Sequence, residues 1–125
     1  MATSLSLRVS CRPEALREVR DAVDTLDTLD QRTFDAVKLA TNELVANSIG
    51  HSGLGKDAYI EITVATQRDL VRIDVHDAGG GFTLPDSQPR RFGGRGLAMV
   101  QSLSTLMGIS HNGITRAWAE IEVGA

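Results

Sequence analysis

The stretch Glu43-Leu44-Val45-Ala46-Asn47-Ser48-Ile49-Gly50-His51 decides how the rest of the chain is interpreted. Asn47 follows Glu43 by four residues, and His51 follows Asn47 by four. On an α-helix this spacing stacks the three side chains on one face, about 6 Å apart. The resulting column of a carboxylate, an amide oxygen and an imidazole can line a cleft. The alternative is a solvated helix face that happens to be polar.

The chemistry of this column is compatible with a nucleotide site that holds a metal ion, although this stretch alone slightly favours the solvated helix face. Magnesium that is bound with a nucleotide usually takes one or two protein oxygens, because phosphates and waters complete its octahedron. Asn47 is therefore a candidate ligand of Mg²⁺. Glu43, one turn earlier, is a candidate base or water-positioning group.

Composition limits the classes of function. The 125 residues, 42% hydrophobic and 23% charged, predict a single domain over residues 1–125 with its own core. A net charge of −3 and 4% aromatic residues indicate neither the basic surface nor the stacking aromatic side chains that direct nucleic-acid binding needs. No apolar run reaches the roughly 18 residues of a membrane span. The single cysteine and the absence of a signal-peptide pattern predict a cytoplasmic protein that does not bind membranes.

Hydrophobic periodicity predicts an α+β fold. Period-2 alternation indicates strands, and apolar spacings of three and four indicate helices. The pattern predicts strands at 4–10, 58–66, 70–76, 109–111 and 114–123, and helices at 13–27, 34–49 and from 97 to about 106. This order favours two layers, with the helices on one face of a mostly antiparallel sheet.

Two glycine-rich segments adjoin predicted elements, one at the end of a strand and one at the start of a helix. Asp77 ends a strand and precedes Gly79, Gly80 and Gly81, where a carboxylate can accept a hydrogen bond from an exocyclic amine and a flat base can approach the backbone. The alternative is a tight turn that needs positive φ. Gly93-Gly94-Arg95-Gly96 opens a helix, where free N–H groups can cradle phosphates; the alternative is a flexible loop end. The segment between them, residues 82–92, is expected to be a mobile basic loop.

Taken in order, these motifs resemble a known superfamily. A Glu-x-x-x-Asn helix, an Asp-x-Gly-x-Gly strand end, a basic loop and a Gly-x-Gly helix entry are similar to the ATP-binding domain of the GHKL superfamily, which has the Bergerat fold. The resemblance covers essentially the whole chain. It is greatest to the single-domain anti-sigma-factor serine/threonine kinases.

The resemblance implies roles for individual residues. Glu43 would be the catalytic base, Asn47 the magnesium ligand and Asp77 the group that binds the adenine amine. The other nucleotide-binding residues it implies are His51 at the helix end, Gly79 and Gly81 in the base pocket, Gly94 and Gly96 in the lid hinge and phosphate cradle, Leu97 behind them, and Arg95, which competes with Arg90 and Arg91 for the γ-phosphate.

Two positions depart from the family pattern. Phe92 stands where an arginine is expected before the second glycine box. Ile114 directly follows Gly113, where the family often has the threonine that helps to hold adenine. Thr115 comes one residue later and is therefore expected to face the opposite way.

The function that the resemblance implies is an ATP- and Mg²⁺-dependent protein serine/threonine kinase. Its partners would be a STAS-type anti-sigma antagonist, which it phosphorylates, and a sigma factor, which it sequesters; it could also form a homodimer. A second hypothesis is a module that binds ATP or ADP and regulates a partner without transfer. A detached histidine-kinase catalytic half is disfavoured, because the sequence has no dimerisation helix with a phospho-accepting histidine.

Overall fold

The computed structural model describes residues 4–51, 58–77, 100–111 and 115–123. Within these ranges, five strands form one sheet in the order β1-β2-β3-β5-β4, and each neighbouring pair is antiparallel. The elements are β1 (Ser4–Ser10), α1 (Ala15–Val23), α2 (Gln31–His51), β2 (Tyr59–Gln67), β3 (Leu70–Asp77), β4 (Leu106–His111) and β5 (Thr115–Glu122). A short helical stretch at residues 100–103 precedes β4.

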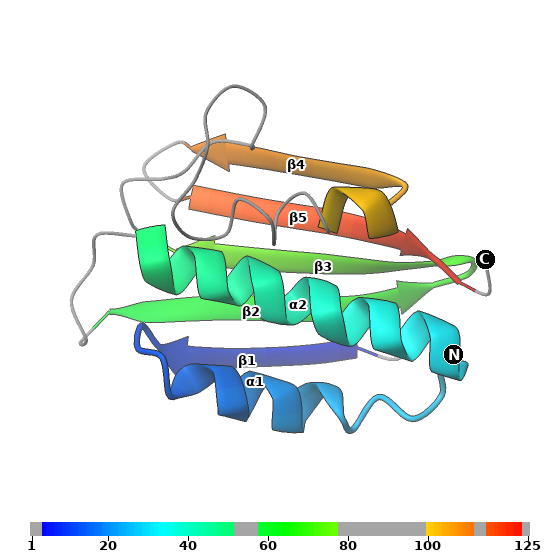
Figure 1. Ribbon diagram of the computed structural model, residues 1–125, viewed down its shortest axis with the longest axis horizontal. Coiled ribbons are helices and arrows are strands. Elements are labelled where there is room, and N and C mark those ends of the chain that lie inside the picture. The colour runs from blue at the N-terminus through cyan, green and yellow to red at the C-terminus, as the bar shows by residue number, and fades with distance from the viewer. Residues whose placement is uncertain (1–3, 52–57, 78–99, 112–114, 124–125) are drawn as a thin grey trace.

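The helices α1 and α2 lie on the same face of the sheet, as Figure 1 shows. The helix α1 packs on β1, and α2 packs on β2, β3 and β5. The predicted α+β arrangement of helices on one face of an antiparallel sheet is confirmed, and it matches a Bergerat fold. No helix in the described part of the chain is long and apolar enough to cross a membrane.

The core lies between the two layers. Alternate residues of the central strands point toward the helices and are fully buried, which is what the period-2 pattern of the sequence predicted. They meet the apolar face of α2. The fully buried side chains with the largest volumes include Val37, Leu44 and Val45 of α2, Ile60, Ile62 and Val64 of β2, and Val71 and Ile73 of β3.

Two helix boundaries differ from the sequence prediction. The helix α1 ends at Val23 instead of continuing to 27, because the Thr25 hydroxyl donates to the Ala22 carbonyl oxygen at 2.6 Å within a tight turn. The helix α2 begins at Gln31 rather than at 34. The Asp30 carboxylate caps it by accepting hydrogen bonds from the Thr33 backbone N–H at 3.2 Å and from the Thr33 hydroxyl at 2.6 Å.

Two further boundaries differ near the ends of the predicted helices. Gly50 was expected to end α2, but the helix continues through it to His51. Leu106 was expected in the last helix, but it begins β4, where it pairs with Glu120. Residues 106–111 form a strand because they gain ladder hydrogen bonds with β5. Local hydrophobic periodicity does not show that this partner strand is available.

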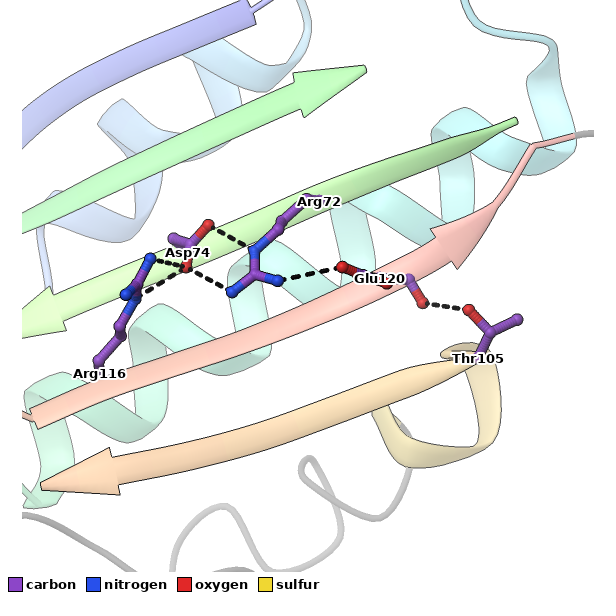
Figure 2. Close-up of polar contacts among 5 residues, drawn as sticks. All are labelled: Arg72, Asp74, Thr105, Arg116 and Glu120. Carbon is purple, nitrogen blue, oxygen red and sulfur yellow. Dashed lines mark hydrogen bonds and ion pairs between the residues drawn. The ribbon is translucent and has the colours of Figure 1, made fainter. Parts of the chain in front are cut away.

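The opposite face of the sheet carries paired charges, which Figure 2 shows. Arg72 contacts Asp74 and Glu120, each at 3.0 Å, and Arg116 contacts Asp74 at 3.0 Å. The hydrogen bond to Asp74 raises the pKa of Arg72 above its ordinary value. Arg72 also lies over the ring of Trp118, 5.5 Å from its centroid. Arg72, Asp74, Arg116 and Glu120 thus neutralise one another on this face.

Trp118 in turn requires a glycine on the neighbouring strand. Gly108 of β4 pairs with Trp118 of β5, and a Cβ atom at position 108 would collide with the indole ring. Glycine is needed at position 108 because the indole ring lies against the backbone there, and not because the backbone adopts a conformation that only glycine allows.

Candidate functional site

Glu43 and Asn47 lie on one stripe of α2. Ala36, Ala40, Glu43 and Asn47 follow one another at spacings of four, three and four, so they share a face of the helix. At the start of this stripe, Ala36 lines a hollow of about 280 Å³ together with Ser102 and Leu103. The end of the stripe, with Glu43 and Asn47, lines a different hollow.

Asn47 is buried, and its amide orientation is fixed. Its side chain is 1% exposed, and its Nδ2 atom donates a hydrogen bond to the Glu43 carbonyl oxygen at 2.9 Å. A carbonyl oxygen can only accept, so this bond leaves the Asn47 Oδ1 atom pointing the other way. Oδ1 is buried and has no hydrogen-bond partner among the described residues. A buried oxygen without a partner is costly in a folded protein, and a bound cation would satisfy it.

Glu43 stands at the edge of a second hollow, which lies between the beginning of α1 and the end of α2. This hollow has a volume of about 310 Å³, and Glu43 and Asn47 both line it. Glu43 is half-buried, so its carboxylate is held on a rigid helix and remains accessible from outside. A group placed in this way can accept a proton from a ligand that approaches over the end of α2.

Asp77 is the last residue of β3, as predicted, and its side chain is 3% exposed. The helix α2 packs on β3, and Figure 1 shows that both elements run in the same direction and end at the same side of the molecule. The tertiary structure therefore brings the end of α2, with Asn47, and the end of β3, with Asp77, to one edge of the domain. The sequence separates these two residues by 30 positions.

The register of β5 places Thr115 directly opposite Asp77 in the antiparallel pair with β3. His111 of β4 pairs with the same residue, so three residues separate the paired ends of the hairpin, where the sequence predicted two. The prediction that Thr115 faces opposite to the position after Gly113 stays a prediction.

Several predicted site residues lie outside the described part of the chain. Gly79, Gly81, Gly94, Arg95, Gly96 and Leu97 fall within residues 78–99, as do Arg90, Arg91 and Phe92. His51 is the last residue of α2, and the description of this position is limited to its backbone. The sequence predictions for these residues stay predictions.

The residues that are described fit a magnesium ion that arrives with a nucleotide. The described part of the chain holds no group of three or more His, Cys, Asp or Glu side chains that could hold a metal. It does hold the partnerless Oδ1 of Asn47, a neutral oxygen of the kind that Mg²⁺ accepts. One protein oxygen is enough when phosphates and waters supply the remaining ligands.

The sequence pattern did not indicate the apolar wall beside Glu43. Pro13, Leu16 and Ile49 line this hollow. A helix-initiating proline that precedes an apolar residue at the start of α1 is too common a pattern to have marked them.

One comparison with known proteins bears on this arrangement. Residues 9–118 match the model of the histidine kinase-like ATPase domain family. No curated protein matches the chain. The matched range includes α2 with Glu43 and Asn47, the end of β3 with Asp77, and the pairing of β3 with β5.

Proposed function

Because the chain belongs to the family of histidine kinase-like ATPase domains, which bind ATP, we propose that it is a protein serine/threonine kinase of the anti-sigma-factor type. It binds ATP with Mg²⁺ and phosphorylates a hydroxyl residue of a STAS-type antagonist protein. It also sequesters a sigma factor, and it acts as a homodimer without direct contact to nucleic acid.

One observation carries this proposal. The buried Asn47 has a partnerless Oδ1 atom, and the accessible carboxylate of Glu43 stands one helical turn away. A module that only bound a nucleotide would need the oxygen of Asn47 and would have no use for the neighbouring carboxylate. Phosphoryl transfer to a protein hydroxyl needs both, because it requires charge neutralisation and a proton acceptor in fixed positions.

Each described residue of the site has one task in this reaction. Asn47 Oδ1 would hold Mg²⁺, which would supply positive charge against the phosphates. Asp77 accepts a hydrogen bond from the adenine amine. Glu43 takes the proton of the acceptor hydroxyl.

The chemical balance of the transfer is simple. A bond forms between the acceptor oxygen and the γ-phosphorus of ATP, while the bond between that phosphorus and the bridging oxygen breaks. ADP leaves with the electron pair of the broken bond, and the hydroxyl proton goes to Glu43. Gly94, Arg95 and Gly96 are assigned to the phosphates, Gly79 and Gly81 to the base, and His51 and Leu97 to the walls, all by resemblance to the family.

A transfer assay tests the proposal. The purified protein is mixed with Mg²⁺, ATP labelled at the γ-phosphate and, one at a time, the purified STAS-type proteins of the same organism. We expect acid-stable label on a serine or threonine of one of them. Tight ATP binding with no label on any acceptor would refute the kinase and favour the non-catalytic module.

A further inference from the structure

The hollow beside Glu43 is an unassigned feature of the domain. Its walls come from two elements, which meet because α1 and α2 run antiparallel, so that α1 begins where α2 ends (Figure 1). Its lining residues are Pro13 and Leu16 on one side and Glu43, Ala46, Asn47, Ile49 and Gly50 on the other.

The hollow suits an apolar side chain better than a nucleotide. Apart from Glu43 and Asn47, the described residues that line it are apolar or glycine. Its volume of about 310 Å³ is at the lower end of the range for ligand pockets, roughly 300–1,000 Å³. It offers no basic side chain to phosphate among its described lining residues.

Apolar surface continues on the other side of Glu43. Leu39 stands one turn before Glu43 on the same outward stripe, which continues through Ala46 and Gly50. It is 38% exposed, one of three large hydrophobic residues that are exposed in the described ranges. Glu43 is thus a carboxylate flanked by apolar surface in both directions along α2.

This arrangement constrains the acceptor protein. A hydroxyl that gives its proton to Glu43 must approach that carboxylate to hydrogen-bond distance, about 3 Å. The residues of the acceptor protein that neighbour this hydroxyl then lie over the surface on either side of Glu43. On one side that surface includes Leu39, and on the other side it includes the hollow.

On the premise that the proposed kinase function is correct, we propose that the hollow is the specificity site for the protein acceptor. It binds an apolar side chain that neighbours the accepting serine or threonine. Leu39 contacts the acceptor on the opposite side of that residue. Ala46, Leu16 and Ile49 therefore select the acceptor, whereas Asn47, which also lines the hollow, serves the nucleotide together with Asp77.

Two substitutions test this proposal at residues that have no assigned role in nucleotide binding. Ala46→Phe fills the hollow, and Leu39→Asp places a charge on the exposed apolar surface. The matched control is Leu106→Asp, which changes a leucine that is 53% exposed on β4, outside α1 and α2. The probe is the STAS-type protein that accepts the label in the transfer assay.

We expect Ala46→Phe and Leu39→Asp each to raise the KM for the acceptor about tenfold or more, because each removes the burial of an apolar side chain. The Kd for ATP with Mg²⁺ should stay within about twofold of the wild-type value. Leu106→Asp should leave both quantities unchanged. Direct titration of the acceptor into the ADP-bound protein, which involves no turnover, should show the same loss of affinity.

The possible failures are distinguishable. If the wild-type protein labels its acceptor and Ala46→Phe leaves KM and acceptor affinity unchanged, the specificity site is wrong and the kinase stands. If Ala46→Phe weakens ATP as much as the acceptor, the hollow belongs to the nucleotide. If the wild-type protein neither labels nor binds any STAS-type protein, both proposals are wrong.

Discussion

Asn47 donates a hydrogen bond from Nδ2 to the Glu43 carbonyl oxygen at 2.9 Å, and this bond joins the two residues on which the proposed chemistry depends. It occupies the donor side of the amide and leaves the acceptor side buried without a described partner. The backbone of α2 thus orients the oxygen that would hold a metal.

Replacing Asn47 by alanine should remove the response of nucleotide binding to magnesium. We expect the affinity for ATP in the presence of Mg²⁺ to fall about tenfold or more, and the affinity in EDTA to change little. Isothermal titration with and without Mg²⁺ measures both. Asn42→Ala is the matched control on a different face of α2 and should behave as wild type; an equal loss in both variants would contradict the metal role.

Replacing Glu43 by alanine should separate binding from transfer. The affinity for ATP should be retained, while the rate of phosphoryl transfer should drop by at least about 10²-fold, the usual effect of losing a general base. Single-turnover transfer of labelled phosphate measures the rate. Asp35→Ala, on an exposed face of the same helix, should transfer normally. A Glu43→Ala protein that transfers at nearly the wild-type rate would show that this carboxylate is not the base.

Replacing Asp77 by asparagine should abolish the preference for ATP over GTP. The carboxylate accepts a hydrogen bond from the adenine amine, and a hydrogen bond to a charged group contributes about 1.5–3 kcal/mol, or roughly 10- to 100-fold in affinity. Calorimetry with both nucleotides measures this. Asp74→Asn is the control on the opposite face of β3, within the ion-pair cluster of Figure 2. An unchanged affinity of Asp77→Asn for ATP would refute the adenine assignment.

Replacing Thr41 by valine should stabilise the protein. Thr41 is fully buried, and its hydroxyl has no hydrogen-bond partner among the described residues. Valine has nearly the same shape and carries no group that must be desolvated, so we expect the free energy of unfolding to rise by about 1 kcal/mol.

Urea denaturation measures the change, and Thr33 supplies the matched control. Thr33 is also buried on α2, but its hydroxyl donates to Asp30 at 2.6 Å, so Thr33→Val should lower the stability. If Thr41→Val destabilises as much as Thr33→Val, the Thr41 hydroxyl has a hydrogen-bond partner in solution.

The cap of α2 should make the stability depend on pH through Asp30. The Thr33 hydroxyl, and then the Thr33 backbone N–H, hold the pKa of the Asp30 carboxyl below its ordinary value. A lowered pKa means that the unfolded chain binds the proton more tightly. The contribution of Asp30 to the folding stability is therefore fully present above the ordinary pKa of the carboxyl, about 4. It is lost as the pH falls through the lowered pKa of the folded protein.

We expect Asp30→Ala to have a lower urea midpoint than the wild-type protein at pH 7, and this difference to narrow progressively below about pH 4. Asp30→Asn, which keeps an uncharged acceptor at the cap, should show less pH dependence. A difference between Asp30→Ala and wild type that stays constant down to low pH would argue against the cap.

The polar half of the site could be predicted from the sequence because it depends on spacing within single elements. Glu43 and Asn47 share a stripe of α2, and Asp77 ends β3, as their positions indicated. The boundaries at Gln31 and Leu106 were predicted less well. The first depends on a side-chain cap and the second on pairing with a distant strand, and hydrophobic periodicity carries neither signal.

By itself, the sequence determined which side chains share a face, since the periods of helix and strand are local properties of the backbone. Only the tertiary structure decided what those faces meet. The burial of the Asn47 oxygen, the pairing of Thr115 with Asp77, and the hollow between Leu16 and Glu43 all join segments far apart in the chain. Such contacts follow from the register of the strands and from the antiparallel packing of α1 against α2. Both depend on how the complete hydrophobic core packs, so no local sequence motif encodes them.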